Sequence, residues 1–194
     1  MNLKDKVNIP LPRSGHTLTS CRTSYILFGG TINGLKDSNV KKIGPTNEVW
    51  NMDILAKGNY NWTKIQVKGQ VPDPRSNHVA VTVKKPGGAV STEILFIHGG
   101  MGEKGKFDDA FFYDPYEQKF LKIDFRKDKL ENGRDSYPSP RANHSACLFN
   151  YKVYIYGGNG GKTYENSVFK DLWEFDCEKL TFLEIKYENQ TSKN

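Results

Sequence analysis

The chain has 194 residues, of which 37% are hydrophobic and 26% charged, and its formal net charge is +6 at pH 7. That length can bury one sizeable core. Because basic and acidic residues are interspersed and no five basic residues are consecutive, the composition favours neither a nucleic-acid partner nor a membrane surface.

Targeting signals and cysteine usage indicate a compartment. No stretch is apolar over the length of a membrane span, and the first residues, Met1 to Lys6, lack the apolar segment of a signal peptide. Cys21, Cys147 and Cys177 show no spacing typical of metal or redox sites. We therefore expect a cytoplasmic protein, with the nucleus as a second location.

One pattern occurs three times along the chain. Each copy opens with Pro-x-Pro-Arg, places a histidine three residues after the arginine, and continues with an alternating apolar run that ends in Gly-Gly. Arg13, Arg75 and Arg141 are separated by 62 and 66 residues, so the period is nearly constant. The openings span residues 10–16, 72–78 and 138–144, and the Gly-Gly pairs are 29–30, 99–100 and 157–158.

Each repeat predicts four short strands. The opening prolines force an extended backbone, and Gly-Gly ends the second strand because glycine adopts conformations closed to residues with a Cβ. A variable polar segment then leads to an aromatic strand and to a last strand with one aromatic residue. In chain order, the strands are expected near 16–22, 25–28, 48–54 and 62–67, then 78–83, 93–98, 110–113 and 119–123, then 144–149, 152–156, 172–176 and 181–185.

Four strands per repeat, with Gly-Gly after the second, are typical of a propeller blade of the kelch kind. The chain resembles the kelch-repeat family over nearly its whole length. The resemblance implies an all-β fold: a partial kelch-type β-propeller with three four-stranded antiparallel blades in a single domain, 1–194. The expected boundaries are about 10–67 for blade 1, 72–124 for blade 2 and 138–187 for blade 3, with 125–137 as an exposed insertion.

Three blades cannot close a ring, because propellers need about four to eight. The outer faces of blades 1 and 3 are therefore expected to expose apolar side chains beyond what soluble monomers usually tolerate. Either the chain is part of a longer propeller, or two copies form a six-bladed ring, or the faces are covered in another way. A partial chain is the preferred interpretation. The expected partners thus include further blades of the parent chain or a second copy.

A narrower resemblance lies in three runs, Pro12 to Thr19, Ile43 to Val49, and Gly99 to Gly102 followed by two aspartates. These runs are similar to the N-terminal kelch region of the kelch-repeat Ser/Thr phosphatases of plants and apicomplexan parasites. In those proteins a metallophosphatase domain follows the propeller. None of the phosphatase motifs occurs in this chain, so we predict no active site and no cofactor here. A dinuclear metal centre is implied only if such a domain follows Asn194.

The arginines are the first candidates for partner binding. The family resemblance implies that Arg13, Arg75 and Arg141 open toward the mouth of the channel, where arginines can bind acidic or phosphorylated peptides by bidentate hydrogen bonds. The structural alternative is that each arginine ties together backbone carbonyls of adjacent blades, and the two roles are compatible.

The variable loops after each Gly-Gly complete the same rim, and a loop of this length is often functional. They span residues 31–46, 101–109 and 159–170, and the candidate binding residues on them are Asn33, Lys36, Met101, Lys104, Asn159 and Lys162.

The repeated histidines His16, His78 and His144 suggest a metal, but they lie on separate blades without a carboxylate at ligand spacing. We interpret them as packing residues and predict no metal site. The sequence thus predicts an interaction module that binds a peptide or protein partner at its loop rim. The alternative is the regulatory kelch region of a metal-dependent Ser/Thr phosphatase whose catalytic domain lies outside this chain. A third possibility is a structural half-propeller that self-associates.

Overall fold

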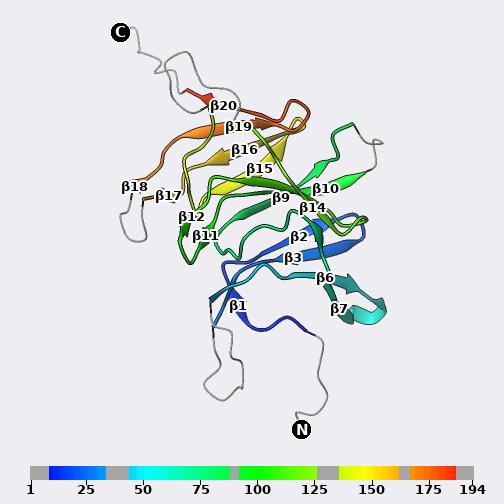
Figure 1. The fold of residues 1–194 in the computed structure, drawn as a ribbon. Coiled ribbons are helices and arrows are strands. Elements are labelled where there is room, and N and C mark those ends of the chain that lie inside the picture. Colours follow the sequence, from blue (N-terminus) through cyan, green and yellow to red (C-terminus); the bar gives the residue numbers. More distant parts are fainter. Residues whose placement is uncertain (1–8, 34–43, 88–91, 126–135, 162–166, 187–194) are drawn as a thin grey trace, which may run out of the picture.

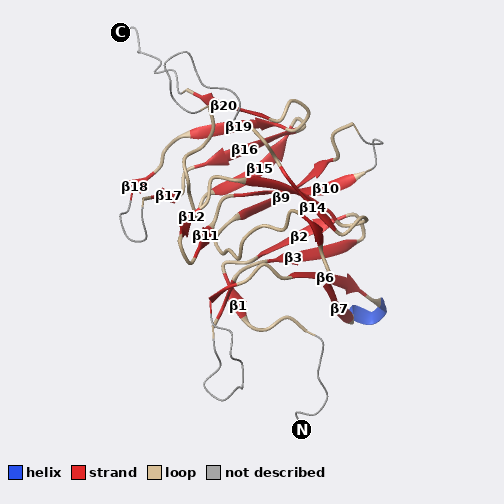
Figure 2. Ribbon diagram, in the orientation of Figure 1, coloured by secondary structure: helices blue, strands red, loops and turns tan. Residues whose placement is uncertain are grey.

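The computed structural model describes residues 9–33, 44–87, 92–125, 136–161 and 167–186. The regular structure is almost entirely β (Figure 2), which confirms the all-β prediction. In these ranges the single helical element is the 3-10 turn η1 (Ala56–Gly58). None of the described residues forms a helix with the length and apolarity needed to cross a membrane.

Three sheets, each built on four antiparallel strands, follow one another along the chain and form the three blades (Figure 1). Blade 1 contains β2 (Thr17–Cys21), β3 (Ser24–Phe28), β6 (Val49–Ile54) and β7 (Tyr60–Ile65). Blade 2 contains β9 (Val79–Lys84), β10 (Glu93–His98), β13 (Ala110–Asp114) and β14 (Lys119–Lys122). Blade 3 contains β15 (Ser145–Phe149), β16 (Lys152–Tyr156), β19 (Leu172–Asp176) and β20 (Thr181–Ile185).

The strand positions agree with the sequence pattern to within two residues. The largest difference is β7, which begins at Tyr60 instead of Trp62. A further strand, β8 (Lys68–Gly69), pairs in parallel with β14 and gives blade 2 a fifth strand at its outer edge. The chain leaving blade 1 therefore crosses to the edge of blade 2 before it enters that blade.

Short strand ladders form within the loops that follow each Gly-Gly. In blade 1, β1 (Arg13–Ser14) pairs with β4 (Thr31–Ile32), and β4 pairs with β5 (Gly44–Pro45). In blade 2, β11 (Met101–Gly102) pairs with β12 (Gly105–Lys106), and in blade 3, β17 (Asn159–Gly160) pairs with β18 (Ser167–Val168). Single bridges from Ser76 to Met101 and from Ala142 to Asn159 extend the pattern.

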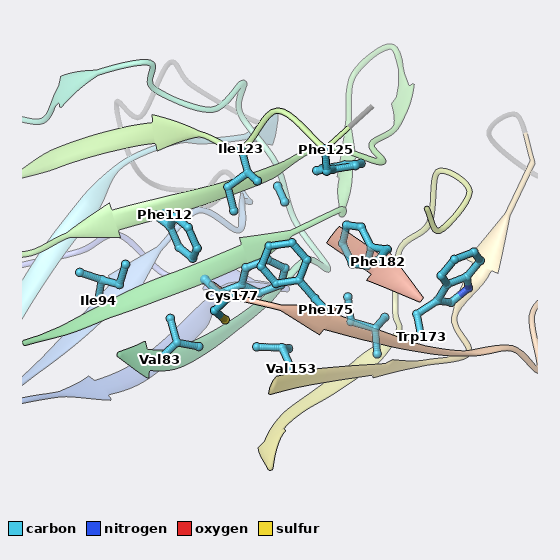
Figure 3. Close-up of a cluster of buried hydrophobic side chains, with 13 residues drawn as sticks. Val83, Ile94, Phe112, Ile123, Phe125, Val153, Trp173, Phe175, Cys177 and Phe182 are labelled. Atoms are coloured by element: carbon cyan, nitrogen blue, oxygen red, sulfur yellow. The ribbon is translucent and has the colours of Figure 1, made fainter. Parts of the chain in front are cut away.

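The core lies between the blades in two clusters. Along β10, Leu95 and Ile97 face blade 1, whereas Ile94 and Phe96 face blade 3. Blade 2 is thus buried on both faces, which explains why its second strand is a continuous apolar run. Figure 3 shows the cluster between blades 2 and 3.

The prediction of an exposed insertion over 125–137 is wrong at its ends. Phe125 is only 6% exposed and packs edge-on against Phe182 of blade 3, with ring centroids 4.9 Å apart (Figure 3). Tyr137 is partly buried against the same cluster, with its ring centroid 5.3 Å from that of Phe125. The hydrophobic core therefore extends beyond the last strand of blade 2, and residues 126–135 lie outside the described part of the chain.

The two outer faces expose apolar side chains, as expected for an unclosed propeller. Leu18 and Tyr60 lie on the free face of blade 1, and Tyr156 lies on that of blade 3. The face of blade 3 also has a polar centre, because both Lys152 Nζ and Tyr154 Oη donate hydrogen bonds to Glu174.

Candidate functional site

The arginine of blade 2 is held in a buried clamp within its own repeat. Arg75 Nη1 and Nη2 donate to the two carboxylate oxygens of Asp109 at 2.6 and 3.0 Å. Arg75 Nη1 also donates to Gly99 O at 2.9 Å, and Arg75 Nε donates to Asp73 O at 3.1 Å. The guanidinium lies 4.2 Å from the centre of the Phe107 ring. Such a bidentate, stacked arrangement fixes the guanidinium geometrically.

Blade 3 repeats this clamp almost atom for atom. Arg141 donates to both oxygens of Asp171 at 2.7 Å and to Gly157 O at 2.9 Å, and its guanidinium lies 4.3 Å from the Phe169 ring centre. Burial alone would raise the pKa of Asp171, but hydrogen bonds from Arg141 and Trp173 outweigh it and lower that pKa. The carboxylate is therefore ionised and paired.

Blade 1 has a looser version of the clamp. Arg13 donates to Glu48 at 2.8 Å and to Gly29 O at 3.1 Å, and Thr46 takes the place of the stacking phenylalanine. Burial opposes ionisation of Glu48, but hydrogen bonds from Lys64, Arg13 and Trp50 lower its pKa to about 2. Within the described residues Glu48 therefore has a second cationic partner, Lys64, whereas Asp109 and Asp171 each form an ion pair with their arginine alone.

The arginines connect two blades, but not in the way expected. Each side chain binds carbonyls of its own repeat, and the main chains of Arg75 and Arg141 also bind the preceding blade. Gly30 N donates to Arg75 O at 2.8 Å, and Arg75 N donates to Thr46 O at 3.1 Å. Because Arg75 and Arg141 are 0% exposed and their guanidinium groups are engaged, the geometry favours the structural role over peptide binding.

The repeated histidines pack at the blade boundaries. His78 Nε2 lies 2.9 Å from Thr17 Oγ1 of blade 1, and His144 Nε2 lies 3.2 Å from His98 Nδ1 of blade 2. Burial lowers the pKa of His78 to about 3 and that of His144 to about 4, with further lowering by Arg75 and Arg141 respectively. Among the described residues no group of His, Cys, Asp and Glu has an arrangement that could hold a metal.

Two grooves open on the rim, one at each blade boundary. The groove between blades 1 and 2 has a volume of about 260 Å³ and is lined by Pro45, Asp73, Pro74, Glu103, Lys104 and Phe107. The groove between blades 2 and 3 has a volume of about 500 Å³ and is lined by Lys104, Gly105, Lys106, Ser139, Pro140, Gly161 and Phe169. In both, the proline before the arginine and the ring that stacks on that arginine form the apolar surface.

The predicted loop residues take different places. Lys104 is exposed and lines both grooves, and Asn33 is exposed at the end of β4. Met101 is bonded to Ser76, and Asn159 is bonded to Ala142, so these two belong to the ladders. Lys36 and Lys162 lie outside the described residues.

Sequence reasoning missed Lys106 and the aromatic groove residues Phe107 and Phe169. A usable signal was present, because each phenylalanine precedes the acidic clamp residue by two positions, in Phe107-Asp108-Asp109 and Phe169-Lys170-Asp171.

Consecutive four-stranded blades joined by arginine and Gly-Gly contacts define a segment of a β-propeller built from repeats. Residues 2–136 match the family model described as "KLHDC2/KLHL20/DRC7 Kelch-repeats domain", and residues 140–185 match the "Kelch motif". The chain belongs to the kelch-repeat family. Kelch repeats indicate a module for protein–protein interaction.

Several longer proteins contain a similar stretch. "Dynein alpha chain, flagellar outer arm" of Chlamydomonas reinhardtii is 27% identical over 164 residues, which cover 84% of this chain and 3% of that protein. "Host cell factor 2" of Homo sapiens is 30% identical over 151 residues, or 77% of this chain and 18% of that protein. "Kelch repeat-containing protein 2" of Saccharomyces cerevisiae is 28% identical over 169 residues, or 84% and 17%. The chain spans less than a fifth of the length of each of these relatives.

Proposed function

We propose that this module binds an acidic segment of a protein partner in the rim groove between blades 2 and 3. The observation that carries the proposal is the groove's charge. Lys104 and Lys106 line it, and none of the described residues that line it carries a carboxylate. Lys106 Nζ donates to Gly160 O at 2.6 Å, which holds the ammonium group at the edge of the groove. An ammonium has three donors, so bonds to an acidic ligand remain available.

The neighbouring groove provides an internal contrast. It has the same proline and phenylalanine arrangement, but Asp73 and Glu103 accompany Lys104 there, and both acids are exposed. Like charges across an interface disfavour a partner. An acidic segment should therefore select the groove between blades 2 and 3.

The apolar part of this groove is fixed in place. Phe169 stacks on the buried guanidinium of Arg141, and Pro140 has a restricted backbone. Little side-chain entropy is then lost when a ligand covers them. The groove thus combines a rigid apolar surface with two cations, a combination suited to a peptide in which acidic and apolar residues alternate.

The test uses a fluorescent peptide of alternating Glu and Leu and measures its affinity by anisotropy. Lys104→Glu should weaken binding by about tenfold or more, since charge reversal at a contact costs more than a kilocalorie. The matched control is Lys57→Glu, the same charge change in η1 of blade 1. Affinity should also fall as salt rises. Equal affinity of the two variants would contradict the proposal.

A second candidate is that the module is the kelch region of a Ser/Thr phosphatase and positions that enzyme on its substrates. The supporting observation is the resemblance in the runs Pro12 to Thr19 and Ile43 to Val49. The relatives named above are not called phosphatases. Reading the gene beyond the Asn194 codon tests this candidate: phosphatase motifs there would support it, and a stop codon would contradict it.

A further inference from the structure

We propose that two copies of this chain associate head to tail, so that blade 3 of each copy docks on blade 1 of the other and six blades close into one ring. The proposal does not depend on the rim groove. It rests on the two blade boundaries within the chain, whose contacts recur and whose unfilled counterparts are found at the chain's two ends.

Three main-chain hydrogen bonds recur at each internal boundary. At the boundary between blades 1 and 2, Gly30 N donates to Arg75 O, Arg75 N to Thr46 O, and Asn77 N to Gly15 O, over 2.8, 3.1 and 2.7 Å. At the boundary between blades 2 and 3, the equivalent bonds run from Gly100 N to Arg141 O, from Arg141 N to Phe107 O and from Asn143 N to Asn77 O, over 2.9, 3.0 and 3.0 Å.

The same six groups are present at the free ends. Blade 3 offers the Gly158 N–H and the carbonyls of Phe169 and Asn143, and blade 1 offers the N–H and carbonyl of Arg13 and the Gly15 N–H. Within the described ranges none of these groups has a main-chain partner across a blade boundary. Gly15, Asn77 and Asn143 share a left-handed conformation, with φ of 65°, 56° and 58°. The backbone of blade 1 is therefore shaped for the contact that blades 2 and 3 make.

Side chains at the ends follow the same template. Phe28 packs on His78 with ring centroids 5.0 Å apart, and His98 packs on His144 at 5.1 Å. Tyr156 holds this position in blade 3 and is 57% exposed. Its equivalent partner would be His16 of the second copy.

A side-chain hydrogen bond at the first boundary also has a counterpart between the two copies. Thr17 Oγ1 contacts His78 Nε2 at the first boundary, and Ser145 occupies the position of Thr17 in blade 3. Its hydroxyl group can therefore pair with His16 of the second copy.

The apolar residue that precedes each Pro-x-Pro-Arg opening supports the same contact. Val71 and Tyr137 precede the openings of blades 2 and 3, and each packs against the core it shares with the preceding blade. Ile9 holds this position in blade 1 but is 52% exposed. A hollow of about 1100 Å³ beside Tyr156 and Ile185 on blade 3 is open to receive it.

The polar centre of blade 3 is compatible with this contact. Glu174 is paired with Lys152 and Tyr154, so covering it leaves no unpaired charge. Asn51 occupies the same place in blade 1 and lies at an internal boundary, where it is bonded to Asp53. Six blades lie within the range of closed propellers. Two identical contacts around a twofold axis leave no free face, so growth stops at two copies.

The first test is the mass in solution, measured by light scattering from about 1 to 100 μM protein. We expect twice the 22.0 kDa chain mass. Tyr156→Glu and Leu18→Glu, on the two facing surfaces, should each give the single-chain mass. Tyr116→Glu in blade 2, at a more exposed tyrosine, should remain a dimer. Two outcomes would overturn the proposal. One is a wild-type chain that stays monomeric over this range, which is expected if blades of a longer polypeptide cover the faces. The other is growth beyond two copies.

The second test uses the chain's own cysteines. Cys147 is exposed on the free face of blade 3, whereas Cys21 and Cys177 are buried. Its equivalent in blade 1, Thr19, contacts blade 2 at Ala80 O, so Cys147 becomes covered in the ring. Maleimide labelling should slow by about tenfold with rising concentration, because covered thiols react slowly. In Tyr156→Glu the rate should not depend on concentration. A concentration-independent wild-type rate contradicts the ring.

Discussion

Arg75 and Asp109 form a buried two-pronged ion pair, with Nη1 to Oδ1 at 2.6 Å and Nη2 to Oδ2 at 3.0 Å. The arginine side chain is completely buried, and the aspartate is largely so. The same arginine binds blade 1 through its main chain. One residue therefore holds the turn that opens blade 2 and also the boundary in front of it.

Removing this arginine should be costly. Arg75→Ala is expected to lower the free energy of unfolding by about 3–5 kcal/mol, since it leaves Asp109 buried without its partner. Arg13→Ala should cost clearly less, because Glu48 keeps Lys64 at 2.5 Å and Trp50 at 3.2 Å. Urea unfolding monitored by tryptophan fluorescence measures both. Equal losses would show that the clamps do not differ as their contacts suggest.

Gly99→Ala should lower the free energy of unfolding by more than the left-handed backbone conformation alone would cause. A Cβ there would lie 2.8 Å from both Arg141 O and His144 Cε1 of blade 3. Gly87 has nearly the same φ, +63° against +66°, but no described residue lies within 4 Å of its added Cβ. Both alanine variants lose about 1–2 kcal/mol to the left-handed conformation. Gly99→Ala should lose more in urea unfolding, and the difference measures the approach of the blades.

Stability should fall between about pH 6.5 and pH 5. Burial and the nearby arginines lower the folded-state pKa of His78 to about 3 and of His144 to about 4, and burial next to His144 lowers that of His98. The unfolded chain binds protons first in this range, so each histidine contributes up to about 1.4 kcal/mol per pH unit, fully retained above pH 6.5 and lost on acidification.

The measurement is urea unfolding at several pH values in that window. Glu48 contributes little to the slope in this window, because its ordinary pKa is 4.5 and its folded pKa is about 2, so it is mostly ionised in both the folded and the unfolded chain above about pH 5. His78→Gln should flatten the dependence by about one proton. An unchanged slope would assign the effect to other groups.

Phe125 tests the extent of the core. Phe125→Ala should cost about 3–5 kcal/mol, as is usual for buried phenylalanine. Leu121→Ala, only four residues earlier but 56% exposed, should stay within about 0.5 kcal/mol of wild type. Chemical unfolding of the two variants compares them directly. A small loss of stability for Phe125→Ala would show that this residue does not belong to the core.

Local signals made the blades predictable. Alternation and Gly-Gly set the positions of the strands, because both act within a few residues. The register was harder where both faces are apolar. Either Phe111 or Phe112 could be the equivalent of Trp50, and the structure pairs Phe111 with Ile97 in the way that Trp50 pairs with Leu27. In Phe111-Phe112 no polar residue distinguishes the faces.

The rim was less predictable, since its ladders use main-chain groups that leave little trace in side-chain composition. The burial of the arginines depends on acids 30 to 35 residues away. A pattern for these acids exists in retrospect, because Glu48, Asp109 and Asp171 each stand two residues before the equivalent third-strand rings Trp50, Phe111 and Trp173.

Blade 2 has a packed neighbour on each face, and its boundaries also carry the two rim grooves. Its central amides can exchange with solvent only after a neighbouring sheet has detached, so opening should begin at blade 1 or blade 3, each of which has one packed neighbour within the chain. A ligand bound in either groove contacts two blades at once, so its binding stabilises the contact between them. Ligand binding at the rim loops should therefore slow the exchange of the central amides of blade 2.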